Sequence, residues 1–160
     1  MGRLALFAAL LAGAASVAGC SFIGWHAGPA TVVDRGVYCG TTSQHSAVHY
    51  FANEAEFASW IDYRGIREFK PKTARDDGVI VVEMGQRMTG GYEINLLPDQ
   101  THVEDDILYL GVSWTAPPHY AAISQAMTSP CVVIAPPAGD YDRVVVVDQL
   151  DNVRGTATVR

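Results

Sequence analysis

The segment GQRMTGGYEINLL, residues 85–97, follows a run of apolar residues and begins another, and the rest of the chain is arranged around it. Its adjacent glycines, Gly90 and Gly91, can adopt positive φ without a steric penalty and therefore mark a tight reversal or a close backbone approach. The run Val79–Val82 precedes them, and apolar residues alternate with polar ones after them. This pattern predicts two strands joined by a glycine-rich loop of about six residues. The loop is either a structural hairpin or an exposed recognition loop over Arg87–Tyr92.

The composition is that of one folded domain. The chain has 160 residues, of which 49% are hydrophobic, and this is enough for a core, so we assign a single β-rich domain to residues 31–160. The formal net charge is −6, and lysine and arginine are sparse and scattered. A nucleic-acid-binding protein needs a basic face that neutralises phosphates. The composition therefore argues against a nucleic-acid partner.

The N-terminus has the pattern of an export signal. A short basic region ending at Arg3 precedes the apolar stretch Leu4–Val17, which is too short for a comfortable transmembrane helix. The sequence Val-Ala-Gly-Cys that ends at Cys20 resembles the bacterial lipobox. We therefore expect residues 1–19 to be a lipoprotein signal peptide and residues 20–30 to form a lipidated N-terminus and tether. An ordinary secretory signal is the alternative.

The lipid expected on Cys20 makes the membrane the first predicted partner, because two or more acyl chains on one residue give stable anchoring. Ser21 follows this cysteine, and in Gram-negative lipoproteins a serine there resembles the default for the outer membrane. We expect a lipid-anchored outer-membrane protein that faces the periplasm. The inner membrane and the cell surface remain alternatives.

Two cysteines, Cys39 and Cys131, remain when Cys20 carries lipid. An even number of cysteines in an exported protein favours a disulfide. The bond would close a loop of about 90 residues, for which the chain-entropy model gives about 4–5 kcal/mol. The alternative is a nucleophilic cysteine near a histidine, and neither local sequence favours it.

The mature chain predicts an α+β fold rich in antiparallel strands, either a sandwich or a partly open barrel, with one packed helix at about residues 54–64. Asn53 as N-cap, with an acid three residues later, is a variant of the capping box, and Gly65 marks the helix end. The continuous apolar run Val79–Met84 predicts a strand covered on both faces. Residues 116–130 form a long loop. The other predicted strands are 31–33, 46–51, 92–97, 107–114, 131–135, 143–149 and 153–159.

No combination of residues forms a recognisable catalytic or metal site. His45 and His49 have the spacing of a helical metal site, but their neighbours favour a strand, on which that spacing separates the two side chains. The acidic run Glu104-Asp105-Asp106 lacks the pattern of a calcium loop and is typical of a solvated turn. We therefore predict a protein that is not an enzyme and that needs no metal and no cofactor.

Two blocks in the second half of the chain carry a more specific signal. Residues 84–94, MGQRMTGGYEI, contain the pattern G-x-x-x-T-G-G-Y-x-[IV], and residues 125–134, QAMTSPCVVI, place a Gln, a Thr and a Pro before a strand. Together they resemble the C-terminal domain of the protease complex subunit PrcB family, over about residues 78–149. Cys131 departs from the family, which often has an aromatic residue at that position. The resemblance implies a small β-rich domain of exported proteins, often lipoproteins, with a non-catalytic accessory role beside a protease.

The resemblance also implies where a partner binds. The predicted partner is a protein, such as a protease of the cell envelope, and two loops at one edge of the sandwich would form its contact surface. The residues carried over are Thr89, Gly90, Gly91, Tyr92, Gln125, Thr128 and Pro130. Arg87, at the start of the glycine-rich loop, is a further candidate for partner binding.

A second resemblance leaves an alternative function open. A Thr-Gly-Tyr loop on a β-sandwich is similar to the loop with which chagasin-type inhibitors block cysteine proteases. Here residues 88–92, MTGGY, replace the Asn-Pro-Thr-Thr-Gly-Tyr pattern of those inhibitors, and the chain has no Arg-Pro-Trp loop.

Overall fold

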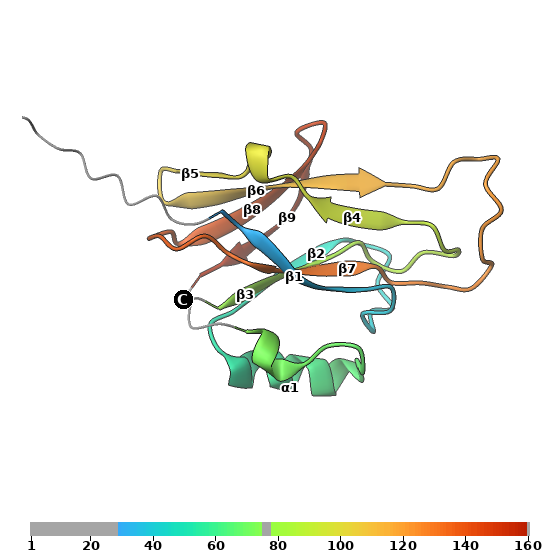
Figure 1. The fold of residues 1–160 in the computed structure, drawn as a ribbon, viewed down its shortest axis with the longest axis horizontal. Helices are drawn as coiled ribbons and strands as arrows, with labels where there is room; N and C mark the ends of the chain where they lie inside the picture. The colour runs from blue at the N-terminus through green and yellow to red at the C-terminus, as the bar shows by residue number, and fades with distance from the viewer. Residues whose placement is uncertain (1–28, 75–77, 160) are drawn as a thin grey trace, which may run out of the picture.

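A computed structural model describes residues 29–74 and 78–159 of the chain, and in this part the elements form three layers (Figure 1). Two β-sheets pack face to face, and helix α1 (Glu54–Arg64) covers the outer face of one sheet. None of the helices in this part is long and apolar enough to cross a bilayer. The predicted signal peptide and Cys20 lie outside the described residues.

The described chain contains nine strands and two short 3₁₀ helices besides α1. The strands are β1 (Thr31–Gly36), β2 (Ala47–Phe51), β3 (Val79–Glu83), β4 (Glu93–Leu96), β5 (His102–Glu104), β6 (Ile107–Thr115), β7 (Cys131–Ala135), β8 (Arg143–Asp148) and β9 (Val153–Thr158). The 3₁₀ helices are η1 (Pro71–Thr73) and η2 (Pro98–Gln100).

The two sheets have different strand orders. The sheet next to the helix, which we call the middle sheet, has the order β1-β7-β3-β2, and all its pairs are antiparallel. The other sheet, which we call the outer sheet, has the order β4-β6-β8-β9, with β5 also paired to β6. Among the described strand pairs only β6 and β8 run parallel, which the sequence did not predict. The predicted α+β fold is confirmed, in the form of a sandwich with one packed helix.

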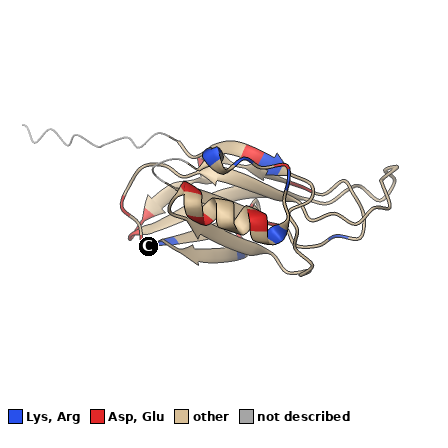
Figure 2. Cartoon of the chain, turned by 90° about the horizontal axis from the view of Figure 1, so that it is seen from below, with Lys and Arg blue, Asp and Glu red and all other residues tan. Residues whose placement is uncertain are grey.

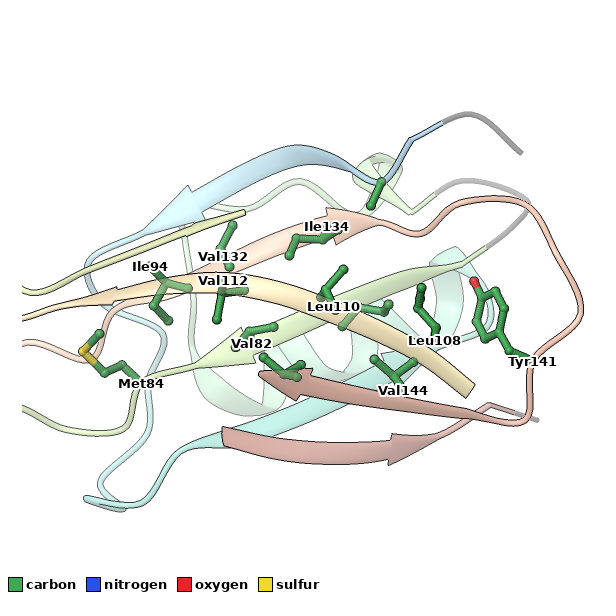
Figure 3. Packing of buried hydrophobic residues seen from close by; sticks show 13 residues of the cluster. Val82, Met84, Ile94, Leu108, Leu110, Val112, Val132, Ile134, Tyr141 and Val144 are labelled. Carbon is green, nitrogen blue, oxygen red and sulfur yellow. The ribbon is translucent and has the colours of Figure 1, made fainter. Parts of the chain in front are cut away.

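Strands β3 and β7 are buried along their whole length because both faces of the middle sheet are covered. Alternate side chains of a strand point to opposite faces. In β3, Ile80 and Val82 pack in the core between the two sheets, whereas Val79 and Val81 pack in the core under the helix. Figure 3 shows Val82 in the core between the sheets. The prediction of a strand covered on both faces is therefore confirmed.

Helix α1 begins and ends where its capping residues predict. The Asn53 side chain accepts a hydrogen bond of 3.0 Å from the backbone N–H of Glu56. Gly65 has a φ of 65°, and its N–H donates to the carbonyl of Asp62. The buried face of the helix presents Phe57 and other apolar side chains to the middle sheet.

The predicted hairpin between the strands on either side of Gly85–Gly91 is wrong. β3 belongs to the middle sheet and β4 to the outer sheet, so residues 84–92 cross from one sheet to the other. The two apolar patterns contain the physical reason. A continuous apolar run suits a strand buried on both faces, and an alternating run suits a strand buried on one, so the two strands belong to different layers.

The two ends of the sandwich differ. The described chain starts at β1 and finishes after β9 at one end, whereas residues 84–92 and 116–130 extend from the opposite end (Figure 1). The strand registers agree with this view, since Cys131 at the start of β7 lies opposite Glu83 at the end of β3. We call the segments 84–92 and 116–130 together the loop end.

Candidate partner-binding site at the loop end

Backbone hydrogen bonds hold the two segments of the loop end together. Arg87 and Thr128 form an isolated antiparallel bridge, with N–O distances of 2.7 and 2.9 Å. The N–H of Gly90 donates to the carbonyl of Ser124 (2.9 Å), and the hydroxyl of Thr128 donates to the carbonyl of Thr89 (2.9 Å). The structure therefore brings the two sequence blocks side by side.

Residues 84–92 form the segment that crosses between the sheets, which we call the crossing segment. Glycine allows it to approach its neighbours closely at two positions. Gly85 and Gly91 have φ values of 86° and 83°. A Cβ atom on Gly85 would lie 2.7 Å from the carbonyl oxygens of Gln44 and His45, and one on Gly91 would lie 2.9 Å from Cβ of Pro117. Other residues would be strained in this conformation and would also collide with these neighbours. Of the two sequence interpretations of the glycine pair, reversal or close approach, the structure shows close approach.

Arg87 and Tyr92 stabilise the crossing segment from within. The guanidinium of Arg87 donates to the carbonyl of Met84 through Nη2 (2.7 Å) and to that of Gln44 through Nη1 (3.4 Å). It also lies over the ring of Tyr92, 5.6 Å from the centroid. Both side chains are half-buried. Their contacts within the crossing segment stabilise its conformation.

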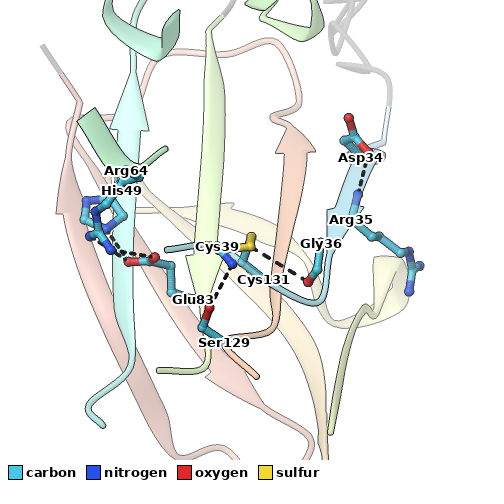
Figure 4. The surroundings of a disulfide bond; sticks show 9 residues. All are labelled: Asp34, Arg35, Gly36, Cys39, His49, Arg64, Glu83, Ser129 and Cys131. Atoms are coloured by element: carbon cyan, nitrogen blue, oxygen red, sulfur yellow. Dashed lines mark hydrogen bonds and ion pairs between the residues drawn. A yellow bond between two sulfur atoms is a disulfide. The ribbon is translucent and has the colours of Figure 1, made fainter. Parts of the chain in front are cut away.

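A disulfide lies at the base of the loop end, as Figure 4 shows. The predicted bond between Cys39 and Cys131 is present, with the two Cα atoms 6.1 Å apart. The backbone N–H of Cys39 donates to Oγ of Ser129 (2.8 Å), and the buried Pro130 accepts from the N–H of Met84 (2.8 Å). Both sulfur atoms are used in the bond, so neither of these cysteines is a free nucleophile.

The exposed side chains of the loop end are uncharged and partly apolar. Met88 and Met127 lie next to the Arg87–Thr128 bridge and are 67% and 51% exposed, and Tyr120 is 92% exposed. Gln125 is exposed as well. Arg87 is the one Asp, Glu, Lys or Arg in the two segments, and Figure 2 shows the other charges elsewhere on the molecule. The loop end is therefore a neutral surface on an acidic chain.

A pocket of about 340 Å³ opens beside the loop end, between the end of β1 and the start of β4. Two of the residues predicted from the sequence blocks, Tyr92 and Pro130, line it. The sequence analysis did not single out its three charged lining residues, Arg35, Glu68 and Glu93. They come from distant parts of the chain, and no local pattern marks them.

The sequence analysis also missed a buried charge cluster on the other side of the disulfide (Figure 4). Glu83 is 1% exposed, and its carboxylate lies 2.8 Å from Nε2 of His49 and 3.3 Å from the guanidinium of Arg64. These contacts join β3, β2 and α1. The sequence feature that could have indicated this cluster was one acidic residue, Glu83, near the end of an apolar run.

The histidine spacing does not form a metal site in the structure. His49 lies on β2, as the sequence predicted, and its ring contacts Glu83 rather than His45. Over residues 29–74 and 78–159 no group of three or more His, Cys, Asp or Glu side chains could hold a metal ion.

Comparison with known proteins gives one match. The family model described as PrcB C-terminal matches residues 79–136, which contain strands β3 to β7 and both segments of the loop end. No curated protein and no solved structure matches the chain. The resemblance carried by the two sequence blocks is thus confirmed, because residues 79–136 match the model of the PrcB C-terminal family.

Proposed function

We propose that this protein is a non-catalytic accessory subunit that binds an envelope protease through its loop end. The observation that carries the proposal is that the family-matching region, residues 79–136, contains both segments of the loop end and joins them by hydrogen bonds. The family name supports a place in a protease complex. The protein binds its partner while a lipid on Cys20 anchors it to the outer membrane, facing the periplasm.

The surface chemistry of the loop end supports a protein partner. Interfaces are enriched in aromatic residues and methionine and depleted in charge at their centre. Met88, Met127 and Tyr120 are exposed at the loop end, where Arg87 is the one charged residue. A neutral surface with exposed apolar side chains has a favourable free energy of burial against a partner.

The position of the loop end supports the proposed anchoring. The described chain begins at the start of β1, at the end of the sandwich opposite the loop end (Figure 1). Because Cys20 precedes β1 in the sequence, a lipid on it would leave the loop end able to point away from the bilayer. In this orientation a periplasmic partner reaches the loop end without contacting the membrane.

A crosslinking pull-down from detergent-solubilised envelope tests the proposal with matched tyrosines. Tyr120 lies in the loop end and Tyr63 lies on α1, and they are 92% and 87% exposed. Tyr92 is less suitable because it is half-buried and packs on the core. We expect a protease to be captured by the wild type and by Tyr63→Ala. Capture should fall at least about fivefold with Tyr120→Ala, because aromatic side chains are the commonest interface hot spots.

A second pair of variants tests the apolar character of the surface. Met88→Asp introduces a charge at the loop end, and Leu150→Asp introduces one at the β8–β9 turn, where Leu150 is also exposed. Capture should be lost with Met88→Asp and kept with Leu150→Asp. Equal capture by all four variants and the wild type would refute the proposed site. Strong inhibition of a papain-like protease by the purified protein would instead support the chagasin-like alternative.

A further inference from the structure

The pocket beside the loop end lies at the seam between an edge strand of the middle sheet and an edge strand of the outer sheet. β1 is the end strand of the middle sheet, and β4 is an end strand of the outer sheet, so each has a strand partner on one side only. Arg35 of β1 crosses the seam and donates to the carbonyl of Ile94 (3.4 Å) and to the side-chain oxygen of Asn95. The pocket opens next to this crossing, towards the loop end.

The pocket is large enough to accept a long side chain, and part of its wall is apolar. Its volume of about 340 Å³ is near the lower limit of ligand pockets, which is about 300 Å³. Tyr92, Ile94 and Pro130 form the apolar part of the wall. Tyr92 and Pro130 also belong to the loop end. A partner segment bound at the base of the loop end, near Tyr92 and Pro130, could therefore reach the mouth of this pocket.

The pocket is lined by two carboxylates and one guanidinium, so its lining has a net negative charge. Glu68 and Glu93 both line it, and neither forms an ion pair within residues 29–74 and 78–159. One carboxylate oxygen of Glu68 lies 3.1 Å from where a Cβ of Gly36 would be, so this side chain lies over the end of β1. The guanidinium of Arg35 donates to uncharged oxygen atoms of β4, so it offsets only one of the two carboxylates. Apolar walls beside a net negative charge match a long aliphatic stem with a cationic end.

We propose that this pocket binds a lysine or arginine side chain from an extended segment of the protein partner. The inference rests on the proposed function, because it names the chemistry that the partner presents next to the loop end. The aliphatic part of the side chain packs on Tyr92, Ile94 and Pro130, and its charged end is neutralised by Glu68 and Glu93. The pocket thereby adds charge recognition to an otherwise neutral surface.

Immobilised peptides that differ only at one central residue test the inference directly. Full-length protein in detergent micelles is applied to peptides with Lys, Arg, Gln or Glu at the centre of a constant Gly-Ala frame. We expect the Lys and Arg peptides to retain at least about fivefold more protein than the Gln peptide, because a charge-assisted hydrogen bond is roughly twice as strong as a neutral one. The double variant Glu68→Gln/Glu93→Gln should lose this preference.

A matched variant controls for the overall negative charge of the protein. Asp99→Asn/Glu104→Gln removes the same two charges from exposed positions away from the pocket and should keep the preference. Equal retention of all peptides by the wild type would overturn the inference. So would a preference that survives the Glu68/Glu93 variant, or one that both double variants lose equally.

The same variants separate this inference from the proposed function. If Tyr120→Ala abolishes capture of the partner while Glu68→Gln/Glu93→Gln leaves capture and peptide binding unchanged, the pocket inference fails and the proposed function stands. If the pocket variant abolishes the peptide preference while the loop-end variants leave capture unchanged, the pocket inference stands and the loop end is not the partner site.

Discussion

At the scale of single residues, Asp148 shows how one buried carboxylate stabilises a turn. It accepts hydrogen bonds from the backbone N–H groups of Leu150 (2.8 Å) and Asn152 (3.0 Å), from the Asn152 side chain and from the guanidinium of Arg154. Burial alone would raise the pKa of Asp148, but these hydrogen bonds outweigh it and lower the pKa from 3.8 to about 2. The charged form therefore stabilises the β8–β9 turn.

This lowered pKa predicts a pH dependence of stability. Because the folded pKa of Asp148 lies below its unfolded value, its contribution is complete above pH 3.8 and is lost as the pH falls through about 2. Asp148→Asn should lower the free energy of unfolding at pH 7 by about 2–3 kcal/mol, because Arg154 loses its charged partner. The variant should also lose less stability than the wild type between pH 4 and about 2 in urea titrations. Parallel losses would show that the pKa is not lowered.

A second residue-scale prediction concerns Glu83, which the sequence analysis did not single out. Glu83→Gln removes a buried charge that contacts His49 and Arg64, and should lower the free energy of unfolding by about 2–3 kcal/mol. Glu104→Gln is the control, because Glu104 is exposed, and its effect should stay within about 0.5 kcal/mol. Urea denaturation at pH 7 measures both. Similar small effects would mean that the buried cluster contributes no net stability.

At the scale of elements, the crossing from β3 to β4 depends on close packing that a side chain would disrupt. Gly85→Ala should lower the free energy of unfolding by at least about 2 kcal/mol, because its Cβ meets two backbone carbonyl oxygens at positive φ. Gly65, at the end of α1, also has positive φ but has no atom within 4 Å of a built Cβ. Gly65→Ala should therefore cost only about 1 kcal/mol. Equal costs, measured by chemical denaturation, would contradict the packing argument.

At the scale of elements, the sequence patterns predicted the helix bounds but not the strand pairing. The bounds of α1 follow from Asn53, Glu56 and Gly65, because capping is decided within one turn of the helix. β3 and β4 are neighbours in the sequence but do not pair with each other. The burial of β3 on both faces and the partial burial of β4 agree with their places in different layers, but the sequence patterns alone did not assign those layers.

At the scale of the whole molecule, the disulfide joins parts of the chain 92 residues apart. The double variant Cys39→Ala/Cys131→Ala should lower the free energy of unfolding by up to about 4–5 kcal/mol, because the unfolded chain gains conformational entropy. Urea denaturation of the variant and the oxidised wild type measures the difference. A loss below about 1 kcal/mol would show that the crosslink does little to restrict the unfolded chain.

The candidate site was predictable in part. The two sequence blocks named the segments that meet at the loop end, because the family pattern spans both. The exposed Met88, Met127 and Tyr120 were not singled out, since a residue's exposure depends on what packs around it. The partner contacts predicted for Arg87 and Tyr92 remain a prediction, and the structure shows in addition that both side chains support the crossing segment.

The sequence by itself determined the local features of this protein: the helix, most strands, the cysteine pair and the presence of a glycine-rich connection after β3. Periodicity, capping and backbone freedom act between near neighbours and are therefore visible in the sequence. Tertiary structure alone decided the layer to which each strand belongs, the parallel pairing of β6 with β8, and the pocket formed by Arg35, Glu68 and Glu93. These features depend on contacts between distant segments, and no local pattern encodes which distant residues will meet.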